Sequence, residues 1–462
     1  MSAMTLFILD LLFLITLLFI GLPLPMCFGG AVAFMTIFAD IGLKGLFLWV
    51  FNQMTSITLI AGPLFIFAGT LICEGGIADR LLDLFSALVG KVKASLGIVS
   101  TLCCGFLGAI SGSAFTGVAA IGPALHPRMV KAGYPKGYAA SLISAGSVLG
   151  QLIPPSSCMI VYGWVTGTSV LACFLATIGP ALVVITLFCI INIIDCRRFP
   201  DGPSEVLTNK VESKVNSAMT ELDDEAADMI GKFKANDVSA MSKKEVFIKA
   251  IPGLMMPVII LGGIYGGIFS PSEAAAVSAS VAIIIGFFIY KKLNGKNVLD
   301  LIKRGSTTVG SIMTMILFCL TLSQTFVLLK IPQQLVEIFM SFTDNRYIVL
   351  LIVNVFLFFI GMIVNDSTTV VLCAPILVPL VGAYGISPIQ MAGIMCTTMA
   401  MGALTPPYAS VLYLGMRVCD CSFEEMIGPM IKFVLLVFVP TALLATFWPP
   451  LSEFLPRVMG YI

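Results

Sequence analysis

Long apolar runs separated by short polar stretches make up most of this chain. Nearly uninterrupted apolar runs lie near 4–24, 26–50, 55–73, 170–194, 248–270, 273–290, 307–329 and 430–455. A helix needs roughly 18–20 apolar residues to cross the hydrocarbon core of a bilayer. The pattern therefore predicts an all-α polytopic membrane protein with crossing helices at these positions.

Two shorter stretches are amphipathic instead. Apolar residues recur at helical spacing over 77–91 and again over 331–342, with polar residues on the other face. Such a pattern is typical of a helix that lies along the membrane–water interface. We predict one interfacial helix at each position.

Two apolar segments are split in the middle by polar or small residues. The segment 94–128 is interrupted at Ser111-Gly112-Ser113, and the segment 346–380 is interrupted at Asn365-Asp366-Ser367. Limbs of about 15 residues are short for crossing a membrane but fit a re-entrant helical hairpin. We predict a hairpin at each segment.

Prolines interrupt two further apolar segments. Pro154-Pro155 falls within 138–166, and Thr405-Pro406-Pro407 falls within 388–417. Consecutive prolines remove backbone donors and clash with the preceding turn, so a continuous helix is disfavoured there. Both segments are predicted to be broken crossing helices.

The two hairpins and the two broken helices share one constant spacing in the sequence. An offset of 252 residues (375 − 123 and 407 − 155) matches the following pairs: Pro123/Pro375, Pro127/Pro379, Pro154/Pro406, Pro155/Pro407, Gly133/Gly385, Gly150/Gly402 and Gly163/Gly415. So many matches in one register indicate an internal duplication.

The number of membrane crossings between the two hairpins determines how the two repeats are oriented relative to each other. Five predicted crossings separate the two hairpins, so the second hairpin enters from the opposite face and the repeat is inverted, as in secondary transporters. We predict a first repeat at 1–193, a charged cytoplasmic loop at 194–249 and a second repeat at 250–462. The loop region 195–249 holds 20 of the 51 charged residues, and most basic residues near helix ends fall on one side, which the positive-inside rule makes cytoplasmic.

Composition narrows the class of protein. Hydrophobic residues make up 58% of the chain, charged residues make up 11%, and the mean hydropathy is +1.03. These values exclude an ordinary soluble domain, and a net charge of +1 argues against nucleic acid as a partner. The 13 cysteines lie mostly inside apolar runs and include no CxxC pair, so we expect apolar fillers, not disulfides or zinc ligands.

Breaks in membrane helices free backbone carbonyls, which persist only where protein or a cavity surrounds them. Carbonyls, hydroxyls and one carboxylate form a hard oxygen site for a small cation, while half-helix N-termini offer N–H groups to an anion. The predicted substrate- and ion-binding residues are Ser111, Gly112, Ser113, Gly150, Pro154, Pro155, Ser156, Asn365, Asp366, Ser367, Thr368, Gly402, Thr405, Pro406 and Pro407. We predict that Ser111, Ser113, Asp366 and Thr405 bind Na⁺. Na⁺ would act as a coupling ion, and we expect no other cofactor.

Simpler interpretations exist for the same residues. The small residues at Ser111–Ser113 also suit close helix packing, and Asp366 could face water at a hairpin tip. The prolines could only kink their helices, and Glu273 is best explained as a helix cap. An intramembrane protease would need a second carboxylate or a base at membrane depth, and the chain offers Asp366 and a single peripheral histidine, so we expect no enzyme.

At these residues the chain resembles a known family. SGS followed by AAIG, then MVKAGY, GQLIPPS and TPP, with GGIYGGIFSPSEAAAVSA at 262–279, is similar to the large membrane subunit (DctM type) of tripartite ATP-independent periplasmic (TRAP) transporters. The resemblance covers nearly the whole chain. It implies a sodium-coupled importer of small organic anions, such as dicarboxylates, that works by an elevator-like movement in the bacterial inner membrane.

The same resemblance implies two partner proteins. A periplasmic substrate-binding protein would deliver the anion, and a small four-helix membrane subunit would complete the complex. The alternative is a self-sufficient sodium-coupled dicarboxylate symporter that needs no binding protein.

Overall fold

The computed structural model describes residues 2–39, 41–89, 94–199, 243–407 and 409–462. The described residues form helices and connecting turns, without any strand. Seven segments are long and apolar enough to cross a membrane: Ile57–Glu74, Lys136–Thr166, Val170–Cys196, Lys244–Tyr265, Pro271–Ile289, Gly295–Leu328 and Phe423–Phe447. The predicted all-α polytopic membrane fold is confirmed.

The N-terminal part differs from the prediction. Four helices precede the first amphipathic one: α1 (Ala3–Phe19), α2 (Leu24–Ala39), α3 (Leu43–Met54) and α4 (Ile57–Glu74). The predicted single crossing at 26–50 is therefore wrong. Gly42 has extended backbone angles (φ −66°, ψ 104°) and starts a new helix, so the apolar run divides into α2 and α3, which pack separately against α16.

Both amphipathic helices are present. They are α5 (Ile77–Val89) and α17 (Ile331–Phe342). On α5, Leu84 packs in a small core with Val246 and Ala250 of α14 (Lys243–Tyr265). Their position at the membrane interface stays a prediction.

The hairpins and broken helices divide close to the predicted positions. The hairpins are α6 (Ser95–Ser111) with α7 (Ala114–Lys131), and α18 (Arg346–Gly361) with α19 (Asp366–Gly382). The broken helices are α8 (Lys136–Ser147), α9 (Leu149–Leu152) and α10 (Ser157–Thr166), and then α20 (Pro388–Gly402) and α21 (Ser410–Cys419). The starts of α7 and α19, and of α8 and α20, differ by the same 252 residues as the sequence motifs (366 − 114 and 388 − 136).

Long helices connect and flank these segments. They are α11 (Val170–Cys196), α14, α15 (Pro271–Ile284) continued by a π-helical turn (Ile285–Ile289), and α16 (Gly295–Leu328). Glu273 is a helix cap as expected, because its side chain accepts from the backbone N–H of Ser270 at 2.8 Å while Ser270 Oγ accepts from the N–H of Glu273 at 3.3 Å. Residues 200–242 of the predicted charged loop lie outside the described residues.

The last crossing helix is displaced from its predicted position at 430–455. It consists of α22 (Phe423–Phe433), a π-helical turn (Val434–Phe438) and α23 (Val439–Phe447), and the short helix α24 (Pro450–Val458) follows it. A capping box between Ser422 and Glu425 starts this helix early. Pro449 and Pro450 end it early, because proline cannot continue the backbone hydrogen-bond pattern.

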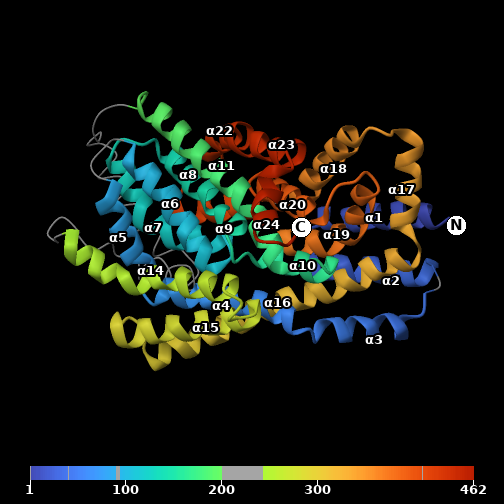
Figure 1. Ribbon diagram of the computed structural model, residues 1–462, viewed down its shortest axis with the longest axis horizontal. Helices are drawn as coiled ribbons and strands as arrows, with labels where there is room; N and C mark the ends of the chain where they lie inside the picture. The colour runs from blue at the N-terminus through green and yellow to red at the C-terminus, as the bar shows by residue number, and fades with distance from the viewer. Residues whose placement is uncertain (1, 40, 90–93, 200–242, 408) are drawn as a thin grey trace.

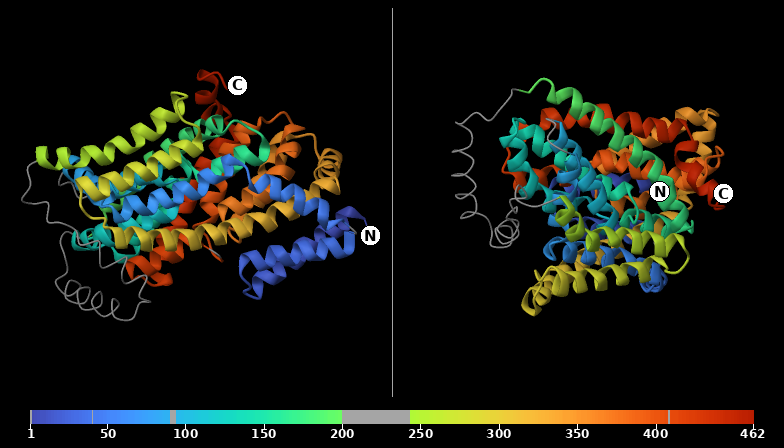
Figure 2. Two further views of the ribbon diagram at one scale, coloured as in Figure 1. Left: turned by 90° about the horizontal axis from the view of Figure 1, so that it is seen from below. Right: turned by 60° about the vertical axis from the view of Figure 1, so that its left-hand side comes forward.

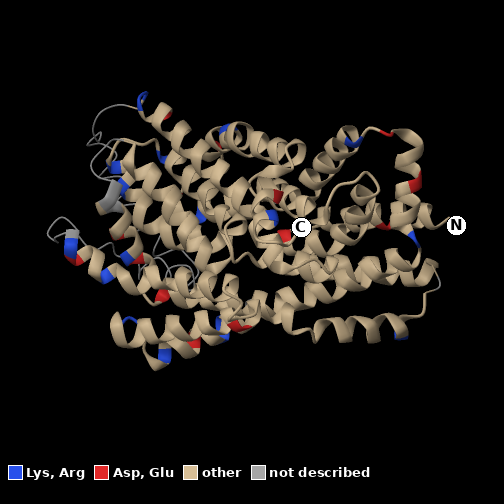
Figure 3. Ribbon diagram, viewed as in Figure 1, with Lys and Arg blue, Asp and Glu red and all other residues tan. Residues whose placement is uncertain are grey.

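The halves of the molecule interlock. Figures 1 and 2 show long helices running along the longest axis, with the broken helices enclosed among them. The second limb of the first hairpin, α7, packs on α21 of the second broken helix, and α19 packs on α10 of the first. Figure 3 shows many of the Lys and Arg residues at the end where α5 and the start of α14 lie, while the helical body is largely uncharged.

Candidate functional site

The tip of the first hairpin is bound to the break in the first broken helix. Gly112 ends α6 in the left-handed conformation (φ 65°), which favours glycine. Its carbonyl oxygen accepts hydrogen bonds from the hydroxyl of Ser157 at 3.0 Å and from the backbone N–H of Ser157 at 3.4 Å. A Cβ at position 112 would lie 2.5 Å from the carbonyl oxygen of Pro155, so only glycine fits here.

Glycines bring the same two segments together beside this contact. A Cβ on Gly108 of α6 would lie 2.2 Å from the Cα of Gly150, and a Cβ on Gly150 would lie 2.6 Å from the carbonyl oxygen of Ser113. The backbones of α6 and α9 therefore touch directly. The predicted residues Ser111–Ser113 and Gly150–Ser156 form one contiguous region.

The three predicted serines of this region use their hydroxyls differently. Ser111 is fully buried and donates to the carbonyl of Leu107 at 2.9 Å. Ser156 caps α10 by accepting from the backbone N–H of Met159 at 3.5 Å. Ser113 precedes α7 as its N-cap residue but makes no capping bond through its side chain. The Ser113 hydroxyl is therefore not used to cap α7.

The tip of the second hairpin is also a helix start. Asn365 caps α19, since its side-chain oxygen accepts from the backbone N–H of Thr368 at 3.1 Å. Asp366 and Ser367 follow in the first turn and are half-buried. The hydroxyl of Thr368 is fully buried and has no hydrogen-bond partner. Buried hydroxyls are normally satisfied, so this oxygen calls for an explanation.

The second break is longer than the predicted Thr405–Pro407, because α20 already ends at Gly402 and α21 begins only at Ser410. Gly402 packs on the first limb of the second hairpin, where a Cβ would lie 2.5 Å from the carbonyl carbon of Gly361. Thr405 donates to the carbonyl of Met401 at 3.0 Å. The peptide bonds Pro154-Pro155 and Pro406-Pro407 are both cis, so the two breaks share one backbone feature.

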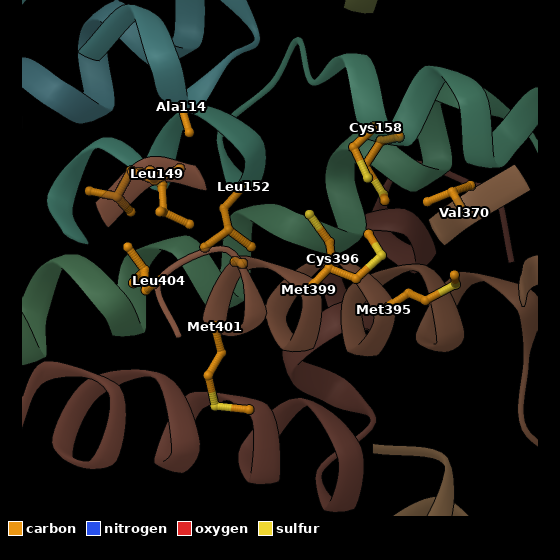
Figure 4. Close-up of a cluster of buried hydrophobic side chains, with 14 of the residues drawn as sticks. Ala114, Leu149, Leu152, Cys158, Val370, Met395, Cys396, Met399, Met401 and Leu404 are labelled. Carbon is orange, nitrogen blue, oxygen red and sulfur yellow. The ribbon is translucent and has the colours of Figure 1, made fainter. Parts of the chain in front are cut away.

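A sulfur-rich core joins the two broken helices. Cys396 of α20 donates from its Sγ to the carbonyl of Gln151, 3.2 Å away in α9. Figure 4 shows Cys158 above Cys396 and Met399, and Leu149 and Leu152 beside the same cluster. These side chains are almost completely buried. The two breaks therefore belong to one packed region of the molecule.

The predicted sodium ligands are not joined by direct hydrogen bonds. Ser111 donates to a carbonyl of its own helix, and Thr405 donates from the break to the carbonyl of Met401 in α20. No hydrogen bond connects the side chains of the four predicted residues, all of which the structure describes. The structure brings the first hairpin tip, Ser111–Ser113, into contact with the break in the first broken helix. Direct contact of Asn365–Thr368 with Thr405–Pro407 does not follow from the hydrogen bonds, and the ligand set stays a prediction.

Four residues of this region were missed by sequence reasoning: Ser157, Gly361, Gln151 and Cys396. Ser157 follows the predicted Ser156, and nothing in the residue order tells which of two adjacent serines turns toward Gly112. Gly361 could have been found, because it lies one position from the offset partner of Gly108 (108 + 252). Gln151 and Cys396 act across the two halves, which the sequence alone does not juxtapose.

Four helices begin at the tips and breaks: α7, α10, α19 and α21. A helix N-terminus carries partial positive charge and unsatisfied N–H donors, which suit an anion. The preceding helices α6, α18 and α20 end at the same places with unsatisfied carbonyls, which suit a cation. Each tip and break therefore combines a helix start, which suits an anion, with a helix end, which suits a cation.

Solved structures share this fold. The crystal structure of the YdaH transporter from Alcanivorax borkumensis superposes with a TM-score of 0.59 at 15% identity, covering 89% of this chain and 90% of that chain. MtrF from Neisseria gonorrhoeae gives a TM-score of 0.57 at 14% identity over 89% of this chain and 85% of that chain. At such identities the likeness shows the fold alone.

Sequence relatives are closer. The C4-dicarboxylate TRAP transporter large permease protein DctM of Vibrio cholerae is 31% identical over 467 residues, covering 96% of each chain. The sialic acid TRAP transporter large permease protein SiaM of the same species is 29% identical over 447 residues (96% of this chain, 97% of the relative). An ectoine/5-hydroxyectoine large permease, UehC of Ruegeria pomeroyi, is 29% identical over 96% of each chain.

The family model of the tripartite ATP-independent periplasmic transporter DctM component matches residues 11–451, nearly the whole chain. The predicted resemblance is confirmed, and relatives of this kind are transporter permeases. The chain belongs to the DctM family of TRAP transporters and is a multi-pass protein of the bacterial inner membrane.

Proposed function

We propose that this chain is the large transmembrane subunit of a sodium-coupled, binding-protein-dependent importer of small organic anions. The observation that carries the proposal is the second hairpin tip, where Asp366 opens α19 and the fully buried hydroxyl of Thr368 has no partner. Relatives named for C4-dicarboxylate and sialic acid transport support a carboxylate substrate.

The anion would be held by backbone N–H groups. The N-termini of α7 and α10 adjoin one another, because the Gly112 carbonyl bonds to Ser157 at the start of α10. A substrate carboxylate placed there would accept N–H bonds that gain from the helix dipoles. No cationic side chain is required, which fits a site that must release its anion in every cycle.

Sodium would be carried with the anion as a second substrate. Asp366 supplies a negative charge, and Thr368 and Ser113 supply hydroxyl oxygens that are not already donating to protein acceptors. Helix-end carbonyls would complete the coordination, since a small hard cation prefers oxygen ligands. An ionisable residue inside an apolar hairpin is costly, and such residues usually serve transport.

Movement of the site would carry both substrates across the membrane. In the proposed inverted repeat, the hairpins and broken helices move together against the remaining helices in an elevator-like manner. The interlocked packing of α7 on α21 and of α19 on α10 supports their movement as one unit.

Partners would complete the transporter. Membership of the TRAP family implies a small membrane subunit and a periplasmic substrate-binding protein in general terms. This chain also matches 59% of the isethionate TRAP transporter permease protein DctMQ of Oleidesulfovibrio alaskensis, which is a longer chain. We propose that a four-helix subunit joins this chain in the membrane.

Uptake by proteoliposomes that contain this chain and its small subunit tests the proposal. Labelled carboxylates are offered with and without an inward sodium gradient, and with and without the binding protein. We expect uptake only when both are present. Uptake that needs sodium but no binding protein would favour the self-sufficient symporter, and uptake indifferent to sodium would contradict sodium coupling.

A further inference from the structure

An apolar cavity lies between the second hairpin and the helices beside it. It has a volume of about 160 Å³. Its walls come from five helices: Phe7 of α1, Phe326 of α16, Phe339 of α17, Phe356 of α18, and Cys373 and Leu377 of α19. No polar side chain contributes to the wall among the lining residues, so neither an ion nor the transported anion suits it.

A space of this size is unusual in a packed interior. Cavities lined by Leu, Ile and Phe with volumes near 150 Å³ stay free of water and bind apolar molecules. An empty cavity costs stability because the lining atoms lose their packing partners. An apolar occupant would recover these contacts, so the cavity is suited to a hydrocarbon.

The mouth of the cavity opens on an exposed apolar face of α18. Ile352 and Phe356 of α18 line the cavity and are also 43% and 38% exposed. The exposed residues beside them on α18 are apolar as well: Ile348, Leu351, Val355 and Phe359. An exposed apolar face of this kind in a membrane protein suits contact with lipid, which would place acyl chains at the opening.

The distance from the end of α18 fits a phospholipid. Arg346 and Tyr347 are exposed at its first turn, where the guanidinium stacks on the tyrosine ring and no carboxylate of the described residues pairs with it. Ile352 and Ile360, which bound the cavity along α18, lie roughly 9 and 21 Å further along the axis at 1.5 Å per residue. A headgroup phosphate at Arg346 places its acyl chain at this depth.

We propose that this cavity is a binding site for one acyl chain of a bilayer phospholipid, whose headgroup phosphate lies near Arg346. The chain fills the seam between the second hairpin, α18–α19, and the helices α1, α16 and α17. A fluid acyl chain there would fill the space between the hairpin and these helices without locking their relative position. The lipid is therefore a structural ligand of the hairpin that carries Asp366.

Photo-crosslinking tests the proposal directly. The full-length chain is reconstituted with phosphatidylglycerol that bears a diazirine in the middle of one acyl chain, and the labelled residues are mapped by mass spectrometry. We expect labels on Cys373, Ile376 or Leu377, which are only 2%, 7% and 5% exposed and line the cavity. Absence of labels on α19 while Phe359 is labelled would overturn the proposal.

A filled cavity provides the control. Cys373→Trp places an indole in the space and should reduce labelling of α19 at least fivefold while labelling of Phe359 is unchanged. Phe359→Trp adds aromatic bulk on the same hairpin outside the cavity and should change nothing. Labelling of α19 that persists in Cys373→Trp would overturn the proposal, because the lipid would then reach α19 by another route.

Thermal stability supplies a second measurement in case the tryptophan variant does not fold. Removal of lipid should lower the melting temperature of the wild type, and added phosphatidylglycerol should restore it. The smaller change Leu377→Phe should reduce that restoration, and Arg346→Gln should reduce it for phosphatidylglycerol. An equal response in wild type and Leu377→Phe would contradict occupation of the cavity.

Discussion

At the scale of single residues, the contact of Gly112 with the carbonyl of Pro155 leaves no room for a side chain. A Cβ at position 112 would meet that oxygen at 2.5 Å, and φ is 65°. Gly112→Ala should therefore lower the free energy of unfolding by roughly 2–4 kcal/mol, since left-handed backbone alone costs alanine about 1–3 kcal/mol. Transport should fall with it.

A matched glycine separates this effect from a general effect of alanine. Gly310 in α16 has no atom within 4 Å of the position that an alanine Cβ would occupy, and its φ is not positive. Gly310→Ala should leave stability unchanged or slightly raised, because alanine favours helix. Equal melting temperatures for the two variants would contradict the close contact at Gly112.

A second residue-scale prediction concerns Asp83 on α5, outside the crossing helices. Burial raises the pKa of Asp83 to about 6, although the positive charge of Arg128 opposes the shift. A carboxyl pKa that is higher in the folded state than in the unfolded chain destabilises the fold at every pH where the group is charged. The loss of stability is therefore complete above about pH 6. It disappears as the pH falls toward the pKa of the unfolded chain, which is near 4.

Asp83→Asn should therefore raise the melting temperature at pH 8 by a few degrees and by progressively less between pH 6 and pH 4. The shift is modest because Asp83 is only partly buried and water screens its charge. Thermal unfolding in detergent at several pH values measures it. A gain that is the same at pH 4 and pH 8 would contradict the role of the carboxylate charge.

Residue types at the site could be predicted because breaks leave a visible signature. Small residues at Ser111–Ser113 and prolines at Pro154-Pro155 interrupt apolar runs, and the structure divides the helices there. Partners could not be predicted in the same way. The hydrogen bond of Cys396 to Gln151 joins residues 245 positions apart, and no local pattern specifies such a contact.

At the scale of secondary structure elements, an ion pair connects the end of α11 to α22. Lys432 contacts Asp195, whose side chain is 5% exposed, whereas that of Lys432 is 37% exposed. Lys432→Met should lower the free energy of unfolding by about 2 kcal/mol, less than the roughly 3–5 kcal/mol typical of a fully buried pair. Chemical denaturation in detergent measures the loss.

The double variant Asp195→Asn/Lys432→Met is the control for this prediction. Removal of both charges leaves no buried unpaired carboxylate, so most of the stability should return. A double variant as unstable as Lys432→Met alone would show that packing of the lysine chain, and not the charge, holds the two helices together.

Element boundaries followed from the sequence where strong local signals coincide. The start of α15 at Pro271 was predictable from the capping residues Ser270 and Glu273. The N-terminal run 26–50 was predicted as one helix because hydropathy does not show where the chain turns. The turn at Gly42 leaves the run apolar, so the hydropathy pattern gives no sign of the break between α2 and α3. Hydropathy also misplaced the start of the last crossing helix. Its cap at Ser422 lies before the apolar run begins, so the helix starts earlier than the run.

At the scale of the whole molecule, the two halves form one unit by exchanging contacts. The second limb of each hairpin packs on the last part of the opposite broken helix: α7 packs on α21, and α19 packs on α10. The duplication in the sequence predicted equivalent elements in each half. It could not predict that each hairpin packs on the broken helix of the other half, because a constant offset in the sequence says nothing about contacts in space.

The tips and breaks of both halves are proposed to form a sodium-coupled carrier, and Asp366 is the side chain on which sodium coupling should depend most. The decisive experiment records the initial rate of anion uptake as a function of sodium concentration, with the binding protein present. Asp366→Asn should raise the sodium concentration for half-maximal uptake at least tenfold or abolish uptake, which corresponds to about 1.4 kcal/mol or more of lost binding.

Asp420→Asn is the matched control, because Asp420 is a carboxylate whose side chain is 52% exposed in the turn after α21. Its sodium dependence should equal that of the wild type. We therefore expect a shift in Asp366→Asn alone, with both variants folded to the same melting temperature. An unchanged sodium dependence in folded Asp366→Asn would show that this carboxylate takes no part in sodium coupling and would overturn the proposed carrier site.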